Sequence, residues 1–272
     1  MERFPKISIV TPSYNQGRFI EDAIESVLKQ NYPYFEHIII DGGSTDSTID
    51  ILKKYPHLIW ISESDKGQSD AINKGFRLVS GDIIGWLNSD DYYLPNTFNA
   101  VAKNMSDSQV DALYGNSRYV DVSGKVTSEQ ITQKSTKWMS LFKCFIPSET
   151  FFFKSDVLQN NIFIDENFDI AMDMELFAHI YFSGYTIIRV NEFLGHFRWH
   201  ETNKSLDTKS VRKIRLREGL EIYNRYSKLN IPENLLGRFS YEILVLICGV
   251  YRRVCRELSI GVYSNSLFQK PS

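Results

Sequence analysis

The chain has 272 residues, of which 43% are hydrophobic and 24% are charged, values that are ordinary for a globular protein and exclude extended disorder. Its 31 Lys and Arg against 33 Asp and Glu give a formal net charge of −2, which excludes the overall basic charge of a nucleic-acid coat protein. The three cysteines, Cys144, Cys248 and Cys255, lack Cys-x-x-Cys spacing. We therefore expect no disulfide framework and no zinc knuckle, and we expect a reducing compartment.

The first 90 residues alternate short apolar runs with amphipathic helices. Strands are predicted at residues 6–11, 37–41, 58–62 and 82–87, and helices between them at residues 18–30, 47–55 and 69–79. Strands that are separated by single helices form parallel βαβ units with right-handed crossovers. Such sheets bind their ligands beyond the carboxyl ends of the strands, so we expect the functional site at this edge.

After residue 91 the pattern becomes less regular. The sequence predicts a helix at 97–105, two antiparallel strands joined near Ser123 and Gly124, a helix at 172–182, and two further strands at 185–190 and 192–199. From about Leu206 the composition is basic and helical. We expect an α/β domain over residues 1–205 and a helical carboxyl-terminal extension over residues 206–272.

Polar clusters follow each of the first four predicted strands, at residues 11–15, 41–44, 63–67 and 88–91. A single cluster of Asp, Gly, Ser and Asn is ordinary turn chemistry, but four clusters at one edge of a sheet predict a binding site. Neither a GxGxxG nor a GxxxxGK[ST] element follows the strands. The sequence therefore gives no support to a Rossmann dinucleotide site or a P-loop.

The segments SIVTPSYN, IIIDGGSTDST, KGQSDAINKGF and GDIIGWLNSDDYYLP resemble inverting nucleotide-sugar glycosyltransferases of family two. The resemblance covers about residues 6–205. It implies a GT-A type α/β fold, in which a mainly parallel nucleotide-binding sheet is flanked by helices. It also implies sugar transfer, with inversion, from a UDP- or dTDP-sugar donor to a hydroxyl of a glycan or lipid-linked acceptor, as in bacterial surface polysaccharide synthesis. No nucleic-acid partner is expected.

The last of these segments resembles the DXD motif of the family, with Asn88 and Ser89 where many members have a further acid. The resemblance makes Asp91 the direct ligand of Mg²⁺ or Mn²⁺, and Asp90 a contact of the ribose or a support of the metal. The chemistry agrees, because a diphosphate leaving group needs its charge neutralised and carboxylates offer hard oxygen ligands. The alternative is that the two acids only cap the next helix.

The resemblance also implies a nucleoside pocket. Asp41 would accept a hydrogen bond from the imide N–H of uracil or thymine, a role that suits a carboxylate. Thr11 and Tyr14 would flank the base, with the Tyr14 ring available for stacking; alternatively, the ring packs beneath a loop. The turn that would approach the base or the diphosphate contains Asp65, Lys66 and Gln68.

Removal of the acceptor proton needs a general base. The segment FDIAMDMELFAHI resembles the acidic motif of the family and places Asp173 at its catalytic position, with Met172 where many relatives have Glu. Asp173 and Glu175 cannot share a helix face, and we assign the base to Asp173. Alternatively, an acid there serves only the helix dipole. A non-catalytic sugar-nucleotide or glycan-binding protein is one alternative function, but such a protein would have no use for a base. A nucleotidyltransferase of the same fold and a retaining enzyme are further alternatives.

The segment GHFRWH, as a strand, would place His196, Arg198 and His200 on one face. The resemblance puts Arg198 near the diphosphate and makes His200 a second metal ligand, whereas His196 is expected to be structural. Aromatic residues at 138–145 and 147–153 are expected to wall the acceptor side, without assignment of individual residues.

Residues 235–258 combine an apolar helical stripe with arginines. The stripe comprises Leu236, Phe239, Ile243, Leu246, Ile247, Val250 and Val254, and the arginines are Arg252, Arg253 and Arg256. Such a helix can lie in a membrane interface without spanning it; the alternative is packing on the catalytic domain or on a second protomer. No targeting segment or spanning run is visible. We therefore expect a cytoplasmic protein, with contact to the inner face of the membrane or homodimerisation as the two options for this helix.

Overall fold

The computed structural model describes residues 4–142, 145–206, 208–229 and 231–266, and the side chains of residues 235, 252 and 255–266 lie outside that description. The expectations for Cys144, Cys255, Arg252 and Arg256 therefore fall outside the described part. Cys248 is buried.

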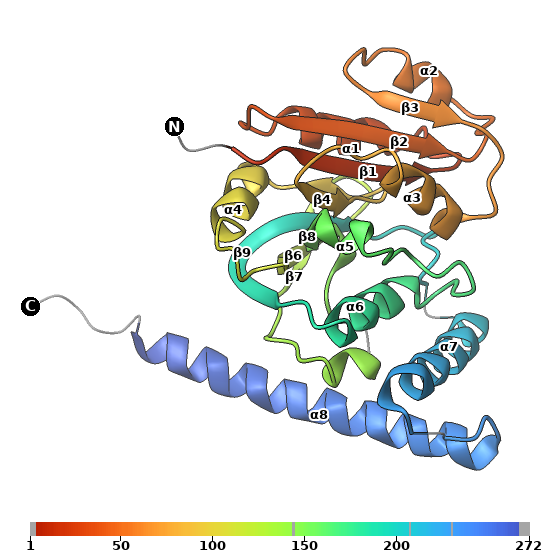
Figure 1. The fold of residues 1–272 in the computed structure, drawn as a ribbon, viewed down its shortest axis with the longest axis vertical. Helices are drawn as coiled ribbons and strands as arrows, with labels where there is room; N and C mark the ends of the chain where they lie inside the picture. Colours follow the sequence, from red (N-terminus) through yellow and green to blue (C-terminus); the bar gives the residue numbers. More distant parts are fainter. Residues whose placement is uncertain (1–3, 143–144, 207, 230, 267–272) are drawn as a thin grey trace, which may run out of the picture.

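Four parallel strands form one half of the sheet, as the βαβ pattern predicted. In chain order, the elements of this half are β1 (Ile7–Ser13), α1 (Ile20–Leu28), β2 (Phe35–Asp41), α2 (Thr48–Leu52), β3 (Ile59–Ser62), α3 (Gln68–Phe76) and β4 (Ile83–Trp86). The strands lie in the order β3-β2-β1-β4 with parallel pairing throughout (Figure 1). Their carboxyl ends therefore meet at one edge.

Alternation of side chains along β2 decides which helix covers which face of the sheet. Ile39 packs in a cluster with α1 and α2, whereas its neighbours Ile38 and Ile40 pack with α3, because successive side chains of a strand point to opposite faces. Helix α3 lies very close to β1: a Cβ atom at Gly75 would lie 2.3 Å from Val10 Cγ1. Glycine permits this approach, which brings the start of α3 to the site edge.

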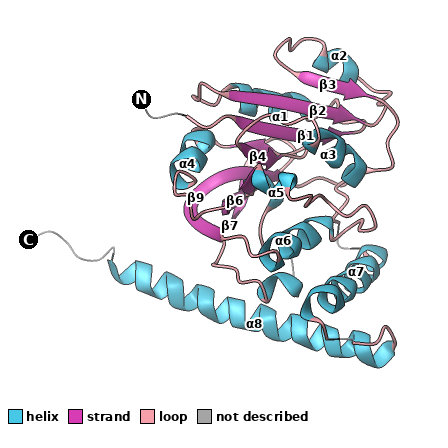
Figure 2. Ribbon diagram, in the orientation of Figure 1, coloured by secondary structure: helices cyan, strands magenta, loops and turns pink. Residues whose placement is uncertain are grey.

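The other half of the sheet is mixed. Its elements are β5 (Tyr92–Tyr93), α4 (Thr97–Asn104), β6 (Ala112–Val120), β7 (Val126–Gln130), β8 (Phe152–Lys154), α5 (Asp156–Gln159), α6 (Met172–Phe182) and β9 (Ile187–Arg198). The order continues from β4 as β8-β6-β9-β5, with β7 paired to β6. Figure 2 shows helices on both sides of this sheet, so the described residues form the layered α/β architecture that the sequence predicted.

One prediction for this half was wrong. The strands expected at 185–190 and 192–199 are a single strand, β9. It runs parallel to β6, and its register shifts near Asn116 of β6. Irregular pairing bends a strand without ending it, so the polar Asn191 and Glu192 mark an irregularity and not a turn.

The carboxyl-terminal extension is built onto the core of the α/β domain. It consists of α7 (Lys209–Ser227) and α8 (Leu235–Ser266). Leu220, Ile222 and Tyr223 of α7 and Tyr241 of α8 belong to the same hydrophobic cluster as the apolar residues of α6. The extension therefore completes the core beneath α6.

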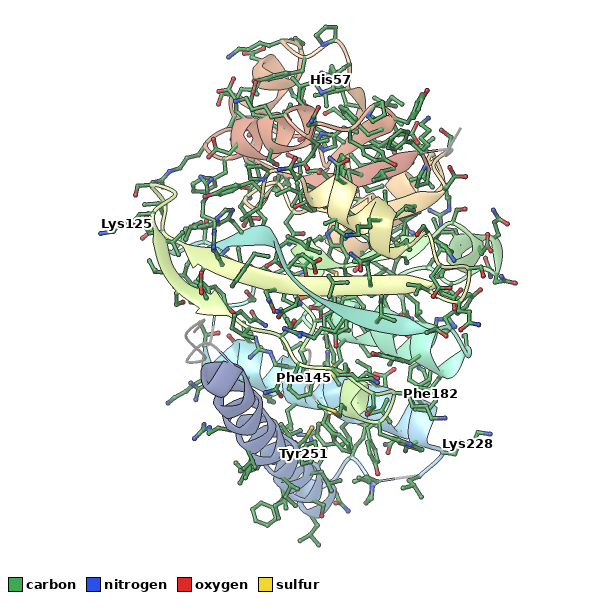
Figure 3. All side chains as sticks on the ribbon, turned by 90° about the vertical axis from the view of Figure 1, so that its left-hand side faces the viewer. His57, Lys125, Phe145, Phe182, Lys228 and Tyr251 are labelled. Carbon is green, nitrogen blue, oxygen red and sulfur yellow. The ribbon has the colours of Figure 1, made fainter. Side chains whose placement is uncertain are left out.

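The opposite face of α8 carries the apolar stripe that the sequence singled out. Its members are 41–77% exposed: Leu236, Phe239, Ile243, Leu246, Ile247, Val250 and Val254. In Figure 3, Tyr251 of α8 lies at the end of the molecule that is remote from His57. Within the described residues, no helix combines the length and the apolar composition that crossing a membrane requires.

Candidate active site

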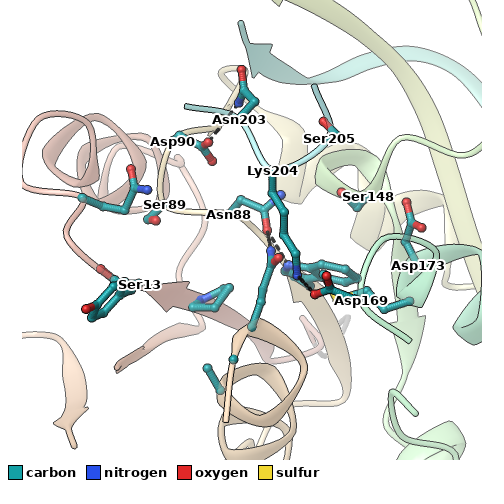
Figure 4. Close-up of a pocket in the computed structure, with 18 of the residues that line it drawn as sticks. Ser13, Asn88, Ser89, Asp90, Ser148, Asp169, Asp173, Asn203, Lys204 and Ser205 are labelled. Carbon is teal, nitrogen blue, oxygen red and sulfur yellow. Dashed lines mark hydrogen bonds and ion pairs between the residues drawn. The ribbon is translucent and has the colours of Figure 1, made fainter. Parts of the chain in front are cut away.

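A cavity of about 440 Å³ opens at the carboxyl edge of the parallel strands. One wall comes from the loops after β1 and β4 and from the loop before α3, and the facing wall comes from Ser148 and residues 169–173 (Figure 4). Residues 202–205, which follow β9, also line it. Three of the four predicted polar clusters thus meet here, and only the cluster after β2 does not.

Asp41, after β2, is used by its own turn. Its side chain is 0% exposed. Its carboxylate accepts hydrogen bonds from the backbone N–H of Gly43 (3.1 Å) and Ser44 (2.9 Å), and from the hydroxyls of Ser44 (2.5 Å) and Ser62 (2.7 Å). Asp41 therefore shapes the strand end and is not among the residues that line the cavity; its predicted contact with the base stays a prediction.

Thr11 is likewise turned into the interior. Its hydroxyl is 2.9 Å from Nε2 of His37, and both side chains are 0% exposed. Burial lowers the pKa of His37 to about 3, so this imidazole is neutral. Thr11 is therefore part of a buried pair between β1 and β2, and it is the next residues, Pro12 to Tyr14, that reach the cavity.

Asp65, Gln68 and Tyr14 lie on the cavity wall, and their predicted contacts with the base or the diphosphate stay predictions. The Asp65 Oδ1 atom accepts the backbone N–H of Gly67 (2.8 Å), and Oδ2 occupies the space beside Gly42, where a Cβ atom would be 2.6 Å away. Gln68 donates to Oδ1 of Asn88 (2.9 Å). Tyr14 is 60% exposed, so its ring is not wedged beneath a loop.

Asp90 lines the cavity and Asp91 does not. The Asp91 carboxylate is 1% exposed, accepts the backbone N–H of Arg198 (2.9 Å) and lies 3.3 Å from the Asn88 amide. Burial, followed by the charges of Asp90 and Glu149, raises its pKa well above the usual range. The structure therefore places Asp90, and not Asp91, on the cavity wall, and the predicted roles of Asp91 as metal ligand and Asp90 as ribose contact or metal support stay predictions.

His200 lies behind Asp90. Its Nε2 atom is 2.9 Å from Asp90 Oδ2, and its Nδ1 atom is 2.8 Å from the hydroxyl of Thr202. Asn203 also donates to Asp90 Oδ2 (3.2 Å) (Figure 4). The imidazole is almost fully buried and both of its nitrogens have partners. His200 is thus placed to orient Asp90, and its predicted role as a direct metal ligand would require the loss of one of these contacts.

Arg198 and Lys66 do not line the cavity either. The Arg198 side chain is 4% exposed, donates to Asp22 of α1 at 2.5 Å, and lies between the rings of Phe19 and Tyr92 at 5.0 and 5.1 Å. In this structure Arg198 thus packs against α1, and its predicted contact with a diphosphate stays a prediction. Lys66 donates its backbone N–H to Asp70. The expected structural role of His196 agrees with its stacking on Tyr92 at 4.4 Å.

Asp173 lies on the facing wall, at the first turn of α6 (Figure 4). Its Oδ1 atom accepts the backbone N–H of Met174 at 2.7 Å. Glu175, two residues on, points away: it is 1% exposed and contacts Arg225 (3.2 Å) and Tyr226 (2.5 Å) of α7. Of the two acids, only Asp173 reaches the cavity, as the spacing argument required.

Two residues that line the cavity, Lys204 and Asp169, were not predicted from the sequence. Lys204 forms an ion pair with Asp169 at 2.7 Å, which joins the loop after β9 to the loop before α6 across the cavity (Figure 4). No motif marks either residue, because their pairing depends on two loops that are distant in sequence. A further acid, Glu149, lies buried near the site and forms a hydrogen bond with Ser117. Burial, with contributions from the charges of Asp173 and Asp90, raises the pKa of Glu149 to about 7.

Comparison with known proteins identifies the family of the chain. The model of glycosyl transferase family 2 matches residues 8–180. TuaG, a putative teichuronic acid biosynthesis glycosyltransferase of Bacillus subtilis, is 41% identical over 93 residues, which are 32% of this chain and 36% of that protein. The chain thus spans about a third of the length of this relative.

Two solved structures share the fold. The structure of S. aureus TarS 1–349 in complex with UDP-GlcNAc has a TM-score of 0.65 at 19% identity, with 83% of this chain and 68% of that chain covered. A mannosyltransferase of Pyrobaculum calidifontis, in complex with GDP-Man and Mn²⁺, has a TM-score of 0.63 at 16% identity, with 98% and 82% covered. Since the family model matches more than half of the chain, we conclude that the chain belongs to glycosyl transferase family 2 and is a glycosyltransferase with the GT-A fold.

Proposed function

We propose that the chain is a metal-dependent, inverting glycosyltransferase that moves a sugar from a nucleoside diphosphate donor to a hydroxyl of a glycan or lipid-linked acceptor. The observation that carries the proposal is a single cavity with acids on two facing walls, Asp65 and Asp90 on one and Asp169 and Asp173 on the other. One wall suits the donor, and the other suits deprotonation of the acceptor.

The charge on the cavity wall supports the need for a metal. Against four lining carboxylates, the described lining contains one ammonium group, that of Lys204, which already pairs with Asp169. A diphosphate brings further negative charge, so it would be repelled unless a cation enters with it. The Mn²⁺ in the structure of the Pyrobaculum mannosyltransferase supports the same proposal.

Asp90 fits such a cation. The hydrogen bonds described for its carboxylate all go to Oδ2, and carboxylate oxygens are the ligands that Mg²⁺ and Mn²⁺ prefer. The described residues contain no group of three or more His, Cys, Asp or Glu placed to hold an ion. Mg²⁺ commonly binds through one or two carboxylates together with substrate phosphates, and a bound ion here would neutralise the leaving diphosphate.

We assign to Asp65 the base-recognition role that the family resemblance implied for Asp41. Asp41 is buried and engaged by four donors, whereas Asp65 lines the cavity beside the exposed Tyr14 ring. A carboxylate can accept the imide N–H of uracil or thymine. We therefore keep a UDP- or dTDP-sugar as the proposed donor, held between Asp65 and Asp90.

Asp173 is the proposed general base. It would take the proton of the acceptor hydroxyl as the oxygen attacks the anomeric carbon, while the bond from that carbon to the diphosphate oxygen breaks. Attack from the Asp173 wall on a donor held at the Asp90 wall comes from the face opposite the leaving group, which inverts the anomeric centre. Such a positioned base contributes typically about 10²–10⁴-fold to the rate.

The extension supports an acceptor at an anionic membrane surface. Residues 206–272 contain 12 Lys and Arg against 6 Asp and Glu, in a chain whose formal net charge is −2. The outer stripe of α8 is apolar and exposed, and basic amphipathic helices bind at the interface of anionic membranes. TuaG is named as a putative glycosyltransferase of teichuronic acid biosynthesis, which supports a polysaccharide as the product.

Sedimentation with vesicles tests this localisation. The intact chain is expected to sediment with anionic vesicles at low salt and to lose this binding when Leu246→Glu interrupts the stripe. Failure to bind vesicles, together with a concentration-dependent dimer that the same substitution dissociates, would assign the stripe to a second protomer instead.

The reaction itself is tested by calorimetric titration of UDP-, dTDP- and GDP-sugars with Mn²⁺ and with excess chelator, followed by mass spectrometry of products with glycan and lipid-linked acceptors. We expect donor binding that needs metal, and a product whose anomeric configuration is inverted by NMR. Tight binding without transfer to any acceptor would indicate a binding protein. Retention of configuration, or equal affinity in chelator, would contradict the mechanism or the metal respectively.

A further inference from the structure

A buried glutamate of the extension reaches the loop that carries the acids of the acceptor side. Glu218 lies on α7 and is 1% exposed. Its Oε1 atom accepts the backbone N–H of Asp169 (3.1 Å), and its Oε2 atom accepts those of Ile170 (2.9 Å) and Ala171 (2.8 Å). One side chain therefore holds three consecutive amides that lie 47 to 49 positions away along the chain.

These three amides directly precede α6. The first N–H groups of a helix and of the residues that lead into it lack partners within the helix, and the residue at the start of α6, Ala171, supplies no side-chain cap. Glu218 provides from another helix the acceptor that the local sequence does not. A carboxylate at this end also interacts favourably with the helix dipole.

The held segment contributes to the cavity. Residues 169–173 include two of the four lining acids, Asp169 and Asp173 (Figure 4), and α6 and α7 lie side by side in Figure 1. We propose that Glu218 is a positioning residue for the base Asp173, so that the extension fixes the acceptor side of the reaction. This inference rests on the proposed function.

Simple packing of α7 does not require this carboxylate. Leu220, Ile222 and Tyr223 already bury apolar surface in the shared core, and an apolar side chain would pack there without the cost of burying a charge. The three N–H donors offset that cost, and their effect is to fix the backbone just before Asp173. Displacement of a reacting group by about 1 Å can lower the rate about 10²-fold.

The α6–α7 contact provides a matched control. Tyr226 of α7 donates to Glu175 of α6 at 2.5 Å, on the side of α6 that points away from the cavity. Tyr226→Phe removes this hydrogen bond and leaves residues 169–171 untouched. Tyr226→Phe therefore measures the effect of a weaker α6–α7 contact while Glu218 still holds residues 169–171.

The test compares Glu218→Ala, the nearly isosteric Glu218→Gln, and Tyr226→Phe by donor Kd with Mn²⁺, by kcat and by Tm. Glu218→Ala is expected to lower kcat roughly 10- to 100-fold with donor Kd unchanged. Glu218→Gln is expected to lower kcat by a smaller factor, because its amide N–H₂ group can face the backbone N–H donors. This variant keeps the test decisive if the Ala variant does not fold. Tyr226→Phe lowers Tm but not kcat.

Amide hydrogen exchange at residues 169–173, which needs no substrate, separates this inference from the proposed function. Faster exchange there in the Glu218 variants, and not in Tyr226→Phe, is expected. Faster exchange with wild-type kcat, or an equal loss of kcat in Tyr226→Phe, would overturn the positioning role. Lack of transfer by the wild-type chain would overturn the proposed function, and with it the role of Glu218 in catalysis, even if the exchange pattern appeared.

Discussion

The two walls of the cavity are held in different ways. The wall of Asp65, Gln68 and Asp90 combines two kinds of contact. Asp65 with Gly67 and Gln68 with Asn88 are contacts that are close in sequence or lie between successive βα units, whereas Asp90 is held by His200 and Asn203, which follow β9. The wall of residues 169–173 depends on distant segments. Glu218 of α7 holds its backbone, and Lys204, after β9, pairs with Asp169.

This difference indicates that donor binding and sugar transfer depend on separable parts of the chain. The parallel half of the sheet supplies the residues of the proposed donor wall, and the segment after β9 orients Asp90 within it. The backbone of the proposed acceptor wall is instead held by α7. Substitutions on the donor wall should change donor affinity. Those on the facing wall should change kcat and leave donor affinity alone.

The largest effect is expected for Asp90. Asp90→Asn should remove metal-dependent donor binding and lower kcat/KM about 10³-fold or more, because a metal at a diphosphate stabilises the transition state by several kcal/mol. Asp91→Asn is the matched control, since the amide replaces a buried carboxyl whose pKa is already raised. Titration calorimetry with Mn²⁺ distinguishes the two, and loss of binding in Asp91→Asn alone would restore the assignment from sequence.

On the facing wall, Asp173→Asn should lower kcat by about 10²–10⁴-fold with donor Kd unchanged, because the amide cannot accept the acceptor proton. Steady-state kinetics and calorimetry on the same samples measure both quantities. Glu175→Gln is the control, since its side chain faces α7. Near wild-type turnover in Asp173→Asn would show that another residue is the base and that the two walls do not have separate roles.

A smaller effect, confined to the donor wall, is expected for Asp65. Asp65→Ala should weaken UDP binding about 10-fold, the contribution of a hydrogen bond to a charged group, with little change for CDP, since cytosine lacks the imide N–H. Competition binding with both nucleotides measures the difference. An equal loss for the two would show that Asp65 does not read the base.

The smallest effect concerns stability. In the unfolded chain the Glu149 carboxyl loses its proton near its usual pKa of 4.5, whereas in the folded chain it keeps the proton up to about 7. The unfolded state therefore binds fewer protons between these values, and the free energy of unfolding falls as the pH rises from about 4.5 to 7. Because Asp91 also has a raised pKa, Glu149→Gln should reduce this fall, and not abolish it, in urea denaturation with chelator. Parallel curves for both proteins would contradict it.

The part of the fold and of the candidate site that could be predicted from the sequence is the part that local motifs determine. Periodicity predicts the strands, the helices and the edge at which the site lies, and the resemblance singled out Tyr14, Asp65, Gln68, Asp90 and Asp173, all of which line the cavity. The same motifs do not show that the turn after β2 engages Asp41, or that Phe19 and Asp22 of α1 enclose Arg198. Lys204 and Glu218 depend on contacts between distant segments, which leave no local signal.

A crystal structure with UDP and Mn²⁺, with the metal located by its anomalous scattering, tests the division of the cavity most directly. We predict a metal at coordination distance from Asp90, the diphosphate against that wall, the base beside Asp65, and the side of the donor that would carry the sugar turned towards Asp173. A metal bound to Asp91 or to His200, or a nucleotide seated against residues 169–173, would contradict the account.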